Sequence, residues 1–276
     1  MTTIPLRLSK SQLDKFQSCA RCFWLKHRAG VDQPDMISSK VWKGVERITQ
    51  GYYDEHRAAK TTPLHLVGQR GVPEGSIPYQ EGRIDLKSLR YWGKGLAFEV
   101  DGVRVTTALD DMLQVADTAV EGGIRYIVDD YKSKSKPTDE EATAELYQNQ
   151  ADVFDYACNV NGYPTDGVVI FDYWSPARVE GAEPPSPVDP FGHTVQRWVG
   201  QVVPLKANHE RMKAIVRAAA ACLESRIPEP SVKITKGPRG GTKVEGCPVC
   251  AYTLDLARAL KDVEAAESAI AAGVPK

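Results

Sequence analysis

The sequence predicts an α/β protein in which helices flank a mixed central β-sheet. Three observations support this class: alternating and β-branched runs cluster between residues 96 and 130, another β-branched run covers 168–173, and helical patterns surround both. Helices that precede, separate and follow strands in this way typically pack on the faces of a shared sheet.

Residues 8–60 are expected to be mainly helical. Ser9 is a favourable N-cap for the first helix, and an apolar stripe predicts a second helix over 38–60. The stretch 61–95 is richer in Gly and Pro, so we expect loops and short strands there, such as 62–66.

Consecutive strands are expected next, with turns at Asp101-Gly102 and Gly122-Gly123. These strands cover 96–100, 103–106, 109–115 and 126–130. Asp139 and Glu140 are suited to the first turn of a helix. The remaining expected elements are a helix over 139–160, a strand over 168–173, a loop over 176–192, a strand over 195–203, a helix over 206–225, a polar loop over 235–245 and a helical tail over 253–276.

Composition indicates an ordinary soluble globular protein. The chain has 276 residues, 42% of them hydrophobic and 26% charged, with a net charge of −1, so it has no global basic field that would indicate nucleic-acid binding. It has no apolar run of about 18 residues and no basic-then-apolar beginning, so we expect no membrane segment, no signal peptide and a cytoplasmic location.

We expect one domain over 1–276. Its parts would be N-terminal helices over 8–60, a core over 96–175 that carries the chemistry, a C-terminal helix and cysteine region over 206–252, and a helical tail over 253–276. A chain of this length is sufficient for one large domain or two small ones.

An acid and a lysine follow the apolar pair Ile127-Val128, in the run that continues to Asp130 and Lys132. Residues i and i+2 of a strand share one face, so these two side chains would point the same way and Asp129 would point to the other face. With Asp110 twenty residues upstream, the spacing is that of a metal-dependent phosphodiesterase site. Taken alone, an Asp-x-Lys is more commonly a solvated strand end.

Two further features accompany this motif. Lys134 and Lys136 form a basic loop that could contact phosphate as point charges or could be a solvated turn. Gln150, on the following helix, could reach a phosphate or a metal-bound water, or could be an exposed helix residue.

The six cysteines have an informative distribution. Cys19 and Cys22 form one C-x-x-C unit, and Cys247 and Cys250 form another. Together they could hold zinc or a [4Fe–4S] cluster, provided that the two segments meet in space, or they could be buried without a metal. The isolated Cys158 and Cys222 are expected to be small buried hydrophobes.

Taken together, these motifs resemble the PD-(D/E)xK nuclease superfamily in its RecB-type branch. The resemblance rests on Asp110, the Asp130-Tyr131-Lys132 motif and Gln150. It also rests on the opening run from Leu8 to Cys19, which looks like the family's LSxSxLxxFxxC, and it covers roughly 8–252.

The resemblance implies a restriction-endonuclease-like core whose chain ends are brought together by the cysteine cluster. It also implies hydrolysis of DNA, with Mg²⁺ or Mn²⁺ bound by Asp110 and Asp130, and with Glu46 and the carbonyl of Tyr131 as further ligands. Glu46 could equally be a surface acid paired with Arg47 or Gln50. Lys132 would polarise the attacking water. The sequence has no helicase motif, so any motor would come from a partner, such as a helicase or another repair or defence protein.

The sequence departs from the family pattern at several positions. The histidine that is common on the early helix looks like Ile48 here, Phe154 stands for a tyrosine, and Thr107 stands for a glycine. The cysteines are arranged as two and two, where the family has one early and three late. Two alternatives therefore stay open: a non-catalytic DNA-binding or scaffold member of the fold, and an interaction protein built around a zinc cluster.

Overall fold

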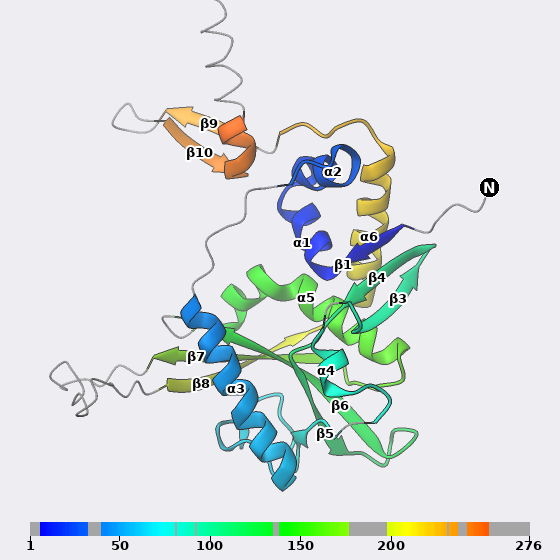
Figure 1. Cartoon of the computed structure of the whole chain (residues 1–276), viewed down its shortest axis with the longest axis vertical. Helices are drawn as coiled ribbons and strands as arrows, with labels where there is room; N and C mark the ends of the chain where they lie inside the picture. Colours follow the sequence, from blue (N-terminus) through cyan, green and yellow to red (C-terminus); the bar gives the residue numbers. More distant parts are fainter. Residues whose placement is uncertain are drawn as a thin grey trace, which may run out of the picture. The chain divides into compact units, whose positions relative to one another are not determined.

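The structure is a computed structural model that describes residues 6–32, 40–80, 82–91, 93–134, 138–176, 198–230, 232–236 and 242–253. The chain forms two compact units, each assembled from segments far apart in the sequence. The first comprises Met1–Lys10 and Ile37–Ala214, and the second comprises Ser11–Met36 and Ile215–Lys276. The α/β class with mixed sheets and flanking helices is confirmed (Figure 1). A single domain over 1–276 stays a prediction.

A five-stranded sheet in the order β2-β5-β6-β7-β8 forms the centre of the first unit. Its strands are β2 (Ile77–Pro78), β5 (Asp111–Ala116), β6 (Ile124–Ser133), β7 (Val168–Pro176) and β8 (Trp198–Lys206). Only β6 and β7 run parallel within this sheet, which makes it mixed. Parallel neighbours need a crossover connection, and α5 (Glu140–Val160) lies in it.

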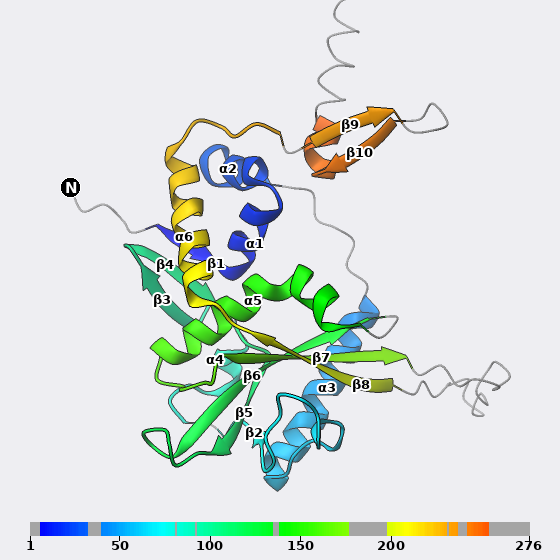
Figure 2. The ribbon, with the colours of Figure 1, turned by 180° about the vertical axis from the view of Figure 1, so that it is seen from behind.

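Helices cover both faces of this sheet. α3 (Lys40–Ala59) contacts β2 and β6, and α5 contacts β7 and β8. α3 crosses in front of the sheet in Figure 1 and lies behind it in Figure 2. The predicted start of α5 is confirmed, since the side chain of Asp139 accepts a hydrogen bond from the N–H of Ala142 at 2.8 Å.

A three-stranded sheet in the order β1-β4-β3 completes the first unit. It consists of β1 (Arg7–Ser9), β3 (Leu96–Val100) and β4 (Val103–Thr107). The predicted turn between β3 and β4 is confirmed: Asp101 and Gly102 both have positive φ, as a tight hairpin of this type requires. Ser9 ends β1 and directly precedes α1 (Lys10–Ser18), as its expected position at the N-cap requires, while Arg7–Ser9 pairs in parallel with β4.

Two local predictions are wrong. A strand was expected at 62–66, but this stretch contains the 3₁₀ turn η1 (Leu64–Leu66). The N–H of Leu66 donates to the carbonyl of Pro63 at 2.9 Å. The expected polar loop at 235–245 contributes to a hairpin of β9 (Val232–Lys236) and β10 (Thr242–Gly246). The short alternating runs that form these strands are obscured in the sequence by the glycine-rich stretch between them. A short helix, α4 (Leu86–Leu89), lies in the stretch expected to contain only loops and strands.

The second unit is mainly helical around its cysteines. It contains most of α1 (Lys10–Ser18), α2 (Ala20–Ala29) and the C-terminal part of α6 (His209–Glu224), together with β9 and β10. The Nε of Arg28 donates to the carbonyl of Leu223 at 2.6 Å, which joins α2 to the end of α6. Lys136, most of the expected loop at 176–192, residues 195–197 and residues 254–276 lie outside the described residues.

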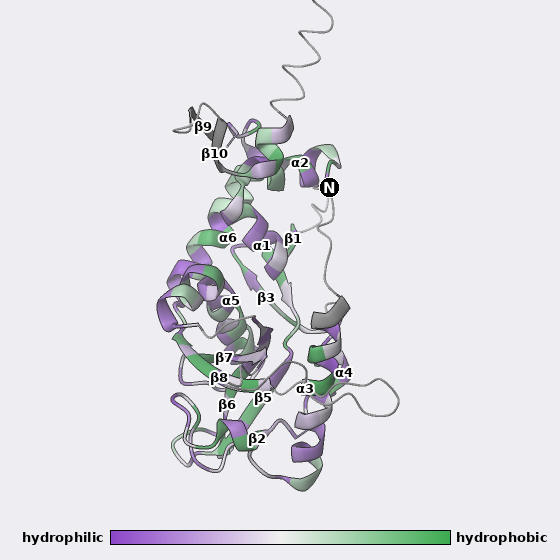
Figure 3. Ribbon diagram, turned by 90° about the vertical axis from the view of Figure 1, so that its left-hand side faces the viewer, coloured by the Kyte–Doolittle hydropathy of each residue, from purple (hydrophilic) through white to green (hydrophobic). Residues whose placement is uncertain are grey.

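The core of the first unit lies against the central strands, where hydrophobic colouring is concentrated in Figure 3. Ile127 and Val128 are 1% and 0% exposed, as expected for the strand that leads to the acid and lysine. A cluster between α3 and the sheet comprises Tyr53, Leu66, Val72, Leu113, Val115, Ile127, Tyr131, Ile170 and Val202. Among the described helices, none has the length and apolar character needed to cross a membrane.

Candidate active site and candidate metal centre

A gap at the edge of β6 brings the predicted acids together. Pairing between β5 and β6 ends where Asp111 lies opposite Asp129, while β6 continues to Ser133 beside β7. The backbone N–H of Tyr131 therefore has no partner on β5. It donates instead to the carboxylate of Asp110 at 3.0 Å, which holds that side chain at the end of the strand.

Both oxygens of the Asp130 carboxylate have partners. Gln150 on α5 donates to Oδ1 at 2.7 Å, and the ammonium of Lys132 binds Oδ2. Asp130 is buried, and the side chain of Lys132 is 17% exposed. The structure thus brings three of the predicted residues into direct contact on the face of the sheet that α5 covers.

Asp110 lies in the field of the same groups. Burial and the Asp130 carboxylate raise its pKa to about 7, while the Lys132 ammonium acts in the opposite direction. Glu46, which is exposed on α3, adds to the rise. Three predicted acids therefore influence one another electrostatically. Glu46 itself accepts a hydrogen bond from Gln50 at 3.3 Å.

Lys132 is enclosed by aromatic rings as well as by acids. Its Nζ lies 4.8 Å from the centre of the Tyr147 ring and 5.6 Å from that of Phe171. Burial acts to lower its pKa, but Asp130 and Asp110 outweigh burial, so the pKa of Lys132 is raised. The side chain is therefore an ammonium at neutral pH.

Asp129 points to the opposite face, as strand alternation predicts. Its Oδ2 accepts from the hydroxyl of Tyr53 on α3 at 2.6 Å. Burial and the nearby Asp172 raise the pKa of Asp129 well above its ordinary value. Oδ2 of Asp172 accepts from His65 Nε2 and from Trp174 Nε1, both at 2.9 Å, and lies 3.0 Å from the same Tyr53 hydroxyl oxygen.

A buried ion cluster, which the sequence did not suggest, supports the start of β5. Asp111 is completely buried and accepts from Arg57 at 2.5 Å, from Arg90 at 2.9 Å and from the hydroxyl of Tyr131 at 2.8 Å. The cluster contacts Tyr131 directly, next to Asp130. No local motif indicates it, because its members come from four separate elements.

The other predicted residues have varied positions. Lys134 donates to the hydroxyl of Thr138 at 2.8 Å and lies over the ring of Tyr173, so its role in binding nucleic acid stays a prediction. Phe154 is buried, and Ile48 is 71% exposed. Tyr147 was missed as a neighbour of Lys132, although its spacing of three from Gln150 places both on one helix face.

The four predicted cysteines meet in the second unit. Sγ–Sγ distances are 3.5 Å for Cys19 and Cys250, 3.7 Å for Cys22 and Cys247, and 3.6 Å for Cys22 and Cys250. All four are buried. Within the described part of the chain, this is the only group of three or more Cys, His, Asp or Glu residues that could hold a metal ion, and its ligand atoms all lie within 4.8 Å of one another.

Local structure prepares the thiols for this role. Cys19 is the N-cap of α2, and its sulfur accepts from the N–H of Cys22 at 3.5 Å. Burial would raise the pKa of Cys247, but hydrogen bonds from the backbone of Cys250 and from neighbouring thiols lower it. Burial and those thiols raise the pKa of Cys250 strongly. Four buried sulfurs this close together could hold a metal ion such as zinc or an iron–sulfur cluster.

The isolated cysteines differ from each other. Cys158 is fully buried as expected, whereas Cys222 is only partly buried. No protein-family model matches this sequence, and a comparison with curated proteins finds no relative.

Proposed function

We propose that the first unit is a divalent-cation-dependent nuclease of the PD-(D/E)xK type, which hydrolyses phosphodiester bonds in DNA. The observation that carries the proposal is the meeting of Asp110, Asp130 and Lys132 at the open edge of β6. Paired carboxylates beside an ammonium suit a reaction in which a cation and a positive side chain stabilise a phosphorane-like charge.

Asp110 and Asp130 are the residues that would hold Mg²⁺ or Mn²⁺, since these ions prefer oxygen ligands. The mutual repulsion that raises the pKa of Asp110 would be relieved by a cation. The carbonyl of Tyr131 lies on the same edge of the strand as its N–H, because both groups of a strand residue point to one side. Glu46 is exposed, so its side chain is free to approach. A bound ion would supply Lewis-acid stabilisation and a more acidic water.

The side chains divide the remaining tasks. Lys132 keeps its proton because its pKa is raised, so it would donate hydrogen bonds to the attacking water or to a phosphate oxygen and would not act as a base. Gln150 touches Asp130, so it would be a positioning residue. Hydrolysis would add one water across a P–O bond, leaving a phosphate monoester and a hydroxyl.

The test compares the full chain with two lysine variants on labelled single-stranded DNA, duplex DNA and RNA, with Mg²⁺ or Mn²⁺. Lys132→Ala should abolish cleavage. Lys213→Ala is the matched control, since Lys213 also lies over a tyrosine ring, 5.5 Å from that of Tyr156, but pairs with Glu210 on α6. Equal cleavage by both variants would overturn the assignment. DNA binding without cleavage would favour the non-catalytic alternative.

We also propose that the four cysteines hold a single tetrahedral ion, zinc in the first instance, which stabilises the second unit. A Zn–S bond of about 2.3 Å implies an S–S edge of about 3.8 Å in a regular tetrahedron, close to the 3.5 to 3.7 Å observed. A [4Fe–4S] cluster binds one thiolate at each of four irons, which spaces the sulfurs more widely.

Metal content distinguishes zinc from an iron–sulfur cluster at the four cysteines. The full chain should contain about one zinc ion per molecule and lack the broad visible absorption of an iron–sulfur cluster. Four irons with matching acid-labile sulfide in anaerobically purified protein would overturn the zinc assignment and leave the cysteine site itself standing.

A further inference from the structure

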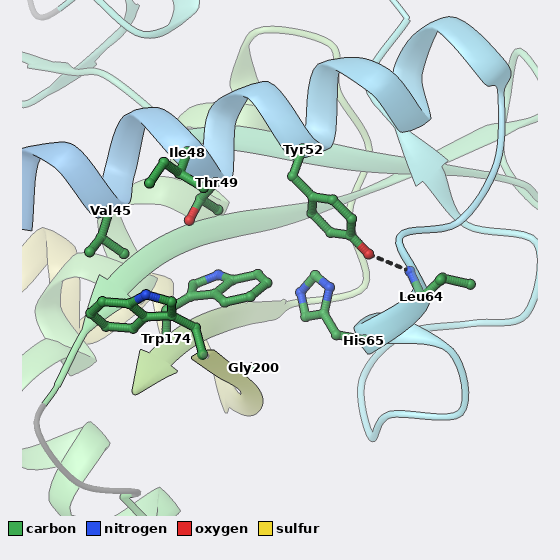
Figure 4. Close-up of a pocket in the computed structure, with 9 residues that line it drawn as sticks. Val45, Ile48, Thr49, Tyr52, Leu64, His65, Trp174 and Gly200 are labelled. Carbon is green, nitrogen blue, oxygen red and sulfur yellow. Dashed lines mark hydrogen bonds between the residues drawn. The ribbon is translucent and has the colours of Figure 1, made fainter. Parts of the chain in front are cut away.

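A cavity in the first unit, apart from the predicted acids, lies on the α3 face of the sheet (Figure 4). Its volume is about 390 Å³, within the roughly 300 to 1,000 Å³ that small-ligand sites occupy. α3 contributes Val45, Ile48 and Tyr52, η1 contributes His65, β7 contributes Trp174 and β8 contributes Trp198.

The cavity is aromatic and carries no formally charged acid, lysine or arginine among its lining residues. A phosphate or carboxylate would find no countercharge there. A flat uncharged ring would find the faces of tryptophan, tyrosine and histidine. The rings of Tyr52 and Trp174 are 6.1 Å apart at 80°, and those of His65 and Trp174 are 4.7 Å apart.

Hydrogen bonds hold these walls in position. The hydroxyl of Tyr52 accepts from the N–H of Leu64 at 2.9 Å, and both His65 and Trp174 donate to the buried Asp172. Gly200 leaves the space for the imidazole, since a Cβ there would lie 2.7 Å from Cδ2 of His65. A ligand would therefore meet rings that are already ordered, which reduces the entropy lost on binding.

The cavity and the Asp130–Lys132 pair lie on opposite faces of the sheet but at the same end of β6 and β7. Trp174 is the register partner of Ser133, which follows Lys132 on β6, and Val45 precedes Glu46 on α3, so a chain that passes around these strand ends could reach both. A ligand that suits both sites is a polymer that carries phosphates, for the carboxylates and their cation, and uncharged rings, for the cavity. A single-stranded nucleic acid is such a polymer, because its unstacked bases present free π-faces.

We propose that this cavity, which we call the ring pocket, receives one unstacked nucleobase of a single-stranded substrate. The inference rests on the proposed nuclease function and names its substrate class. The pocket positions the strand through stacking on Trp174 and its neighbours, while the phosphate lies at Asp110 and Asp130. Duplex DNA, whose bases are stacked and paired, would bind less well.

The test measures binding and not cleavage, so that the two proposals can fail separately. Lys132→Ala protein is titrated, with Ca²⁺ in place of Mg²⁺ or Mn²⁺ to offset the carboxylates, with fluorescent single strands that each carry one abasic residue at a different position. One position should weaken binding by about 5- to 150-fold, the range for loss of one stacked base. The same scan on Lys132→Ala/Trp174→Ala protein should show no such position.

Two further variants keep the test informative if Trp174→Ala fails to fold. Ile48 is 71% exposed, so Ile48→Glu should fold, and its carboxylate beside the pocket should weaken single-strand binding more than Ile48→Ala does. Trp174→Phe keeps an aromatic face and should retain the abasic-sensitive position. Binding that is insensitive to every abasic residue would overturn the ring pocket, and so would equal binding by Ile48→Glu and Ile48→Ala. If an abasic residue at one position weakens binding but the unsubstituted protein cleaves no substrate, the ring-pocket proposal stands and the nuclease proposal fails.

Discussion

Gln150 on α5 donates a hydrogen bond to the carboxylate of Asp130 on β6, with 2.7 Å between Nε2 and Oδ1. The two residues are 6% and 3% exposed, so water has little access to this contact. The other carboxylate oxygen binds Lys132. The orientation of Asp130 is thus determined by one residue on its own strand and one on the crossover helix.

Gln150→Ala should therefore reduce cleavage by about 10- to 100-fold, the usual cost of losing a group that orients a metal ligand. It should also raise the Mn²⁺ concentration that gives half-maximal cleavage. Gln148→Ala is the control, since its amide binds Asp152 and the carbonyl of Lys206. An unchanged Mn²⁺ dependence in Gln150→Ala would contradict the positioning role.

Asp110 should make unfolding depend on pH. Its folded pKa of about 7 lies above the ordinary value near 3.9, so the folded state binds more protons than the unfolded state between pH 4 and pH 7. Stability should fall as the pH rises through this window. Asp110→Asn should remove that loss and stabilise the protein at pH 8 by at most about 4 kcal/mol.

Urea unfolding of Asp110→Asn and the unsubstituted protein at pH 5 and pH 8, without added Mg²⁺ or Mn²⁺, measures this difference. The gain should be larger at pH 8 than at pH 5. A gain that does not vary with pH would contradict the assignment of the titration to Asp110.

Asp111 should contribute strongly to the stability of the first unit. Asp111→Ala would leave Arg57 and Arg90 without their buried partner, at a cost of about 3 to 5 kcal/mol. Asp54→Ala removes a half-exposed carboxylate beside the same two arginines and should cost less than about 1 kcal/mol. Denaturant unfolding measures both changes, and similar values for the two variants would show that the arginines do not depend on Asp111 in particular.

Removal of one thiol should destabilise the second unit. Cys247→Ser should release the bound metal and lower the melting midpoint of this unit by roughly 10 °C, which corresponds to about 2 kcal/mol. Cys222→Ser is the control, because Cys222 lies outside the four-cysteine group. Calorimetry with and without a zinc chelator checks the prediction. If chelation destabilised both variants equally, the cysteine site would not be the cause.

Local patterns predicted much of the secondary structure. The hairpin of β3 and β4 follows from alternation around Asp101-Gly102, and α5 begins at Glu140, one of the acids that were expected to open the helix. The predictions at 62–66 and 235–245 were wrong, because the short elements in these two stretches are obscured by prolines or glycines. The strand at Arg7–Ser9 was not predicted, because it depends on pairing with the distant β4.

The sequence by itself determined which side chains could do chemistry: the alternation that places Asp130 and Lys132 on one face, and the two C-x-x-C units. Only the tertiary structure decided what these residues meet. Strand register leaves the N–H of Tyr131 open to Asp110, and chain packing brings His65 against Trp174 and sets the sulfur spacing. Periodicity and capping depend on near neighbours, whereas register and side-chain contact depend on segments that meet only in the folded chain.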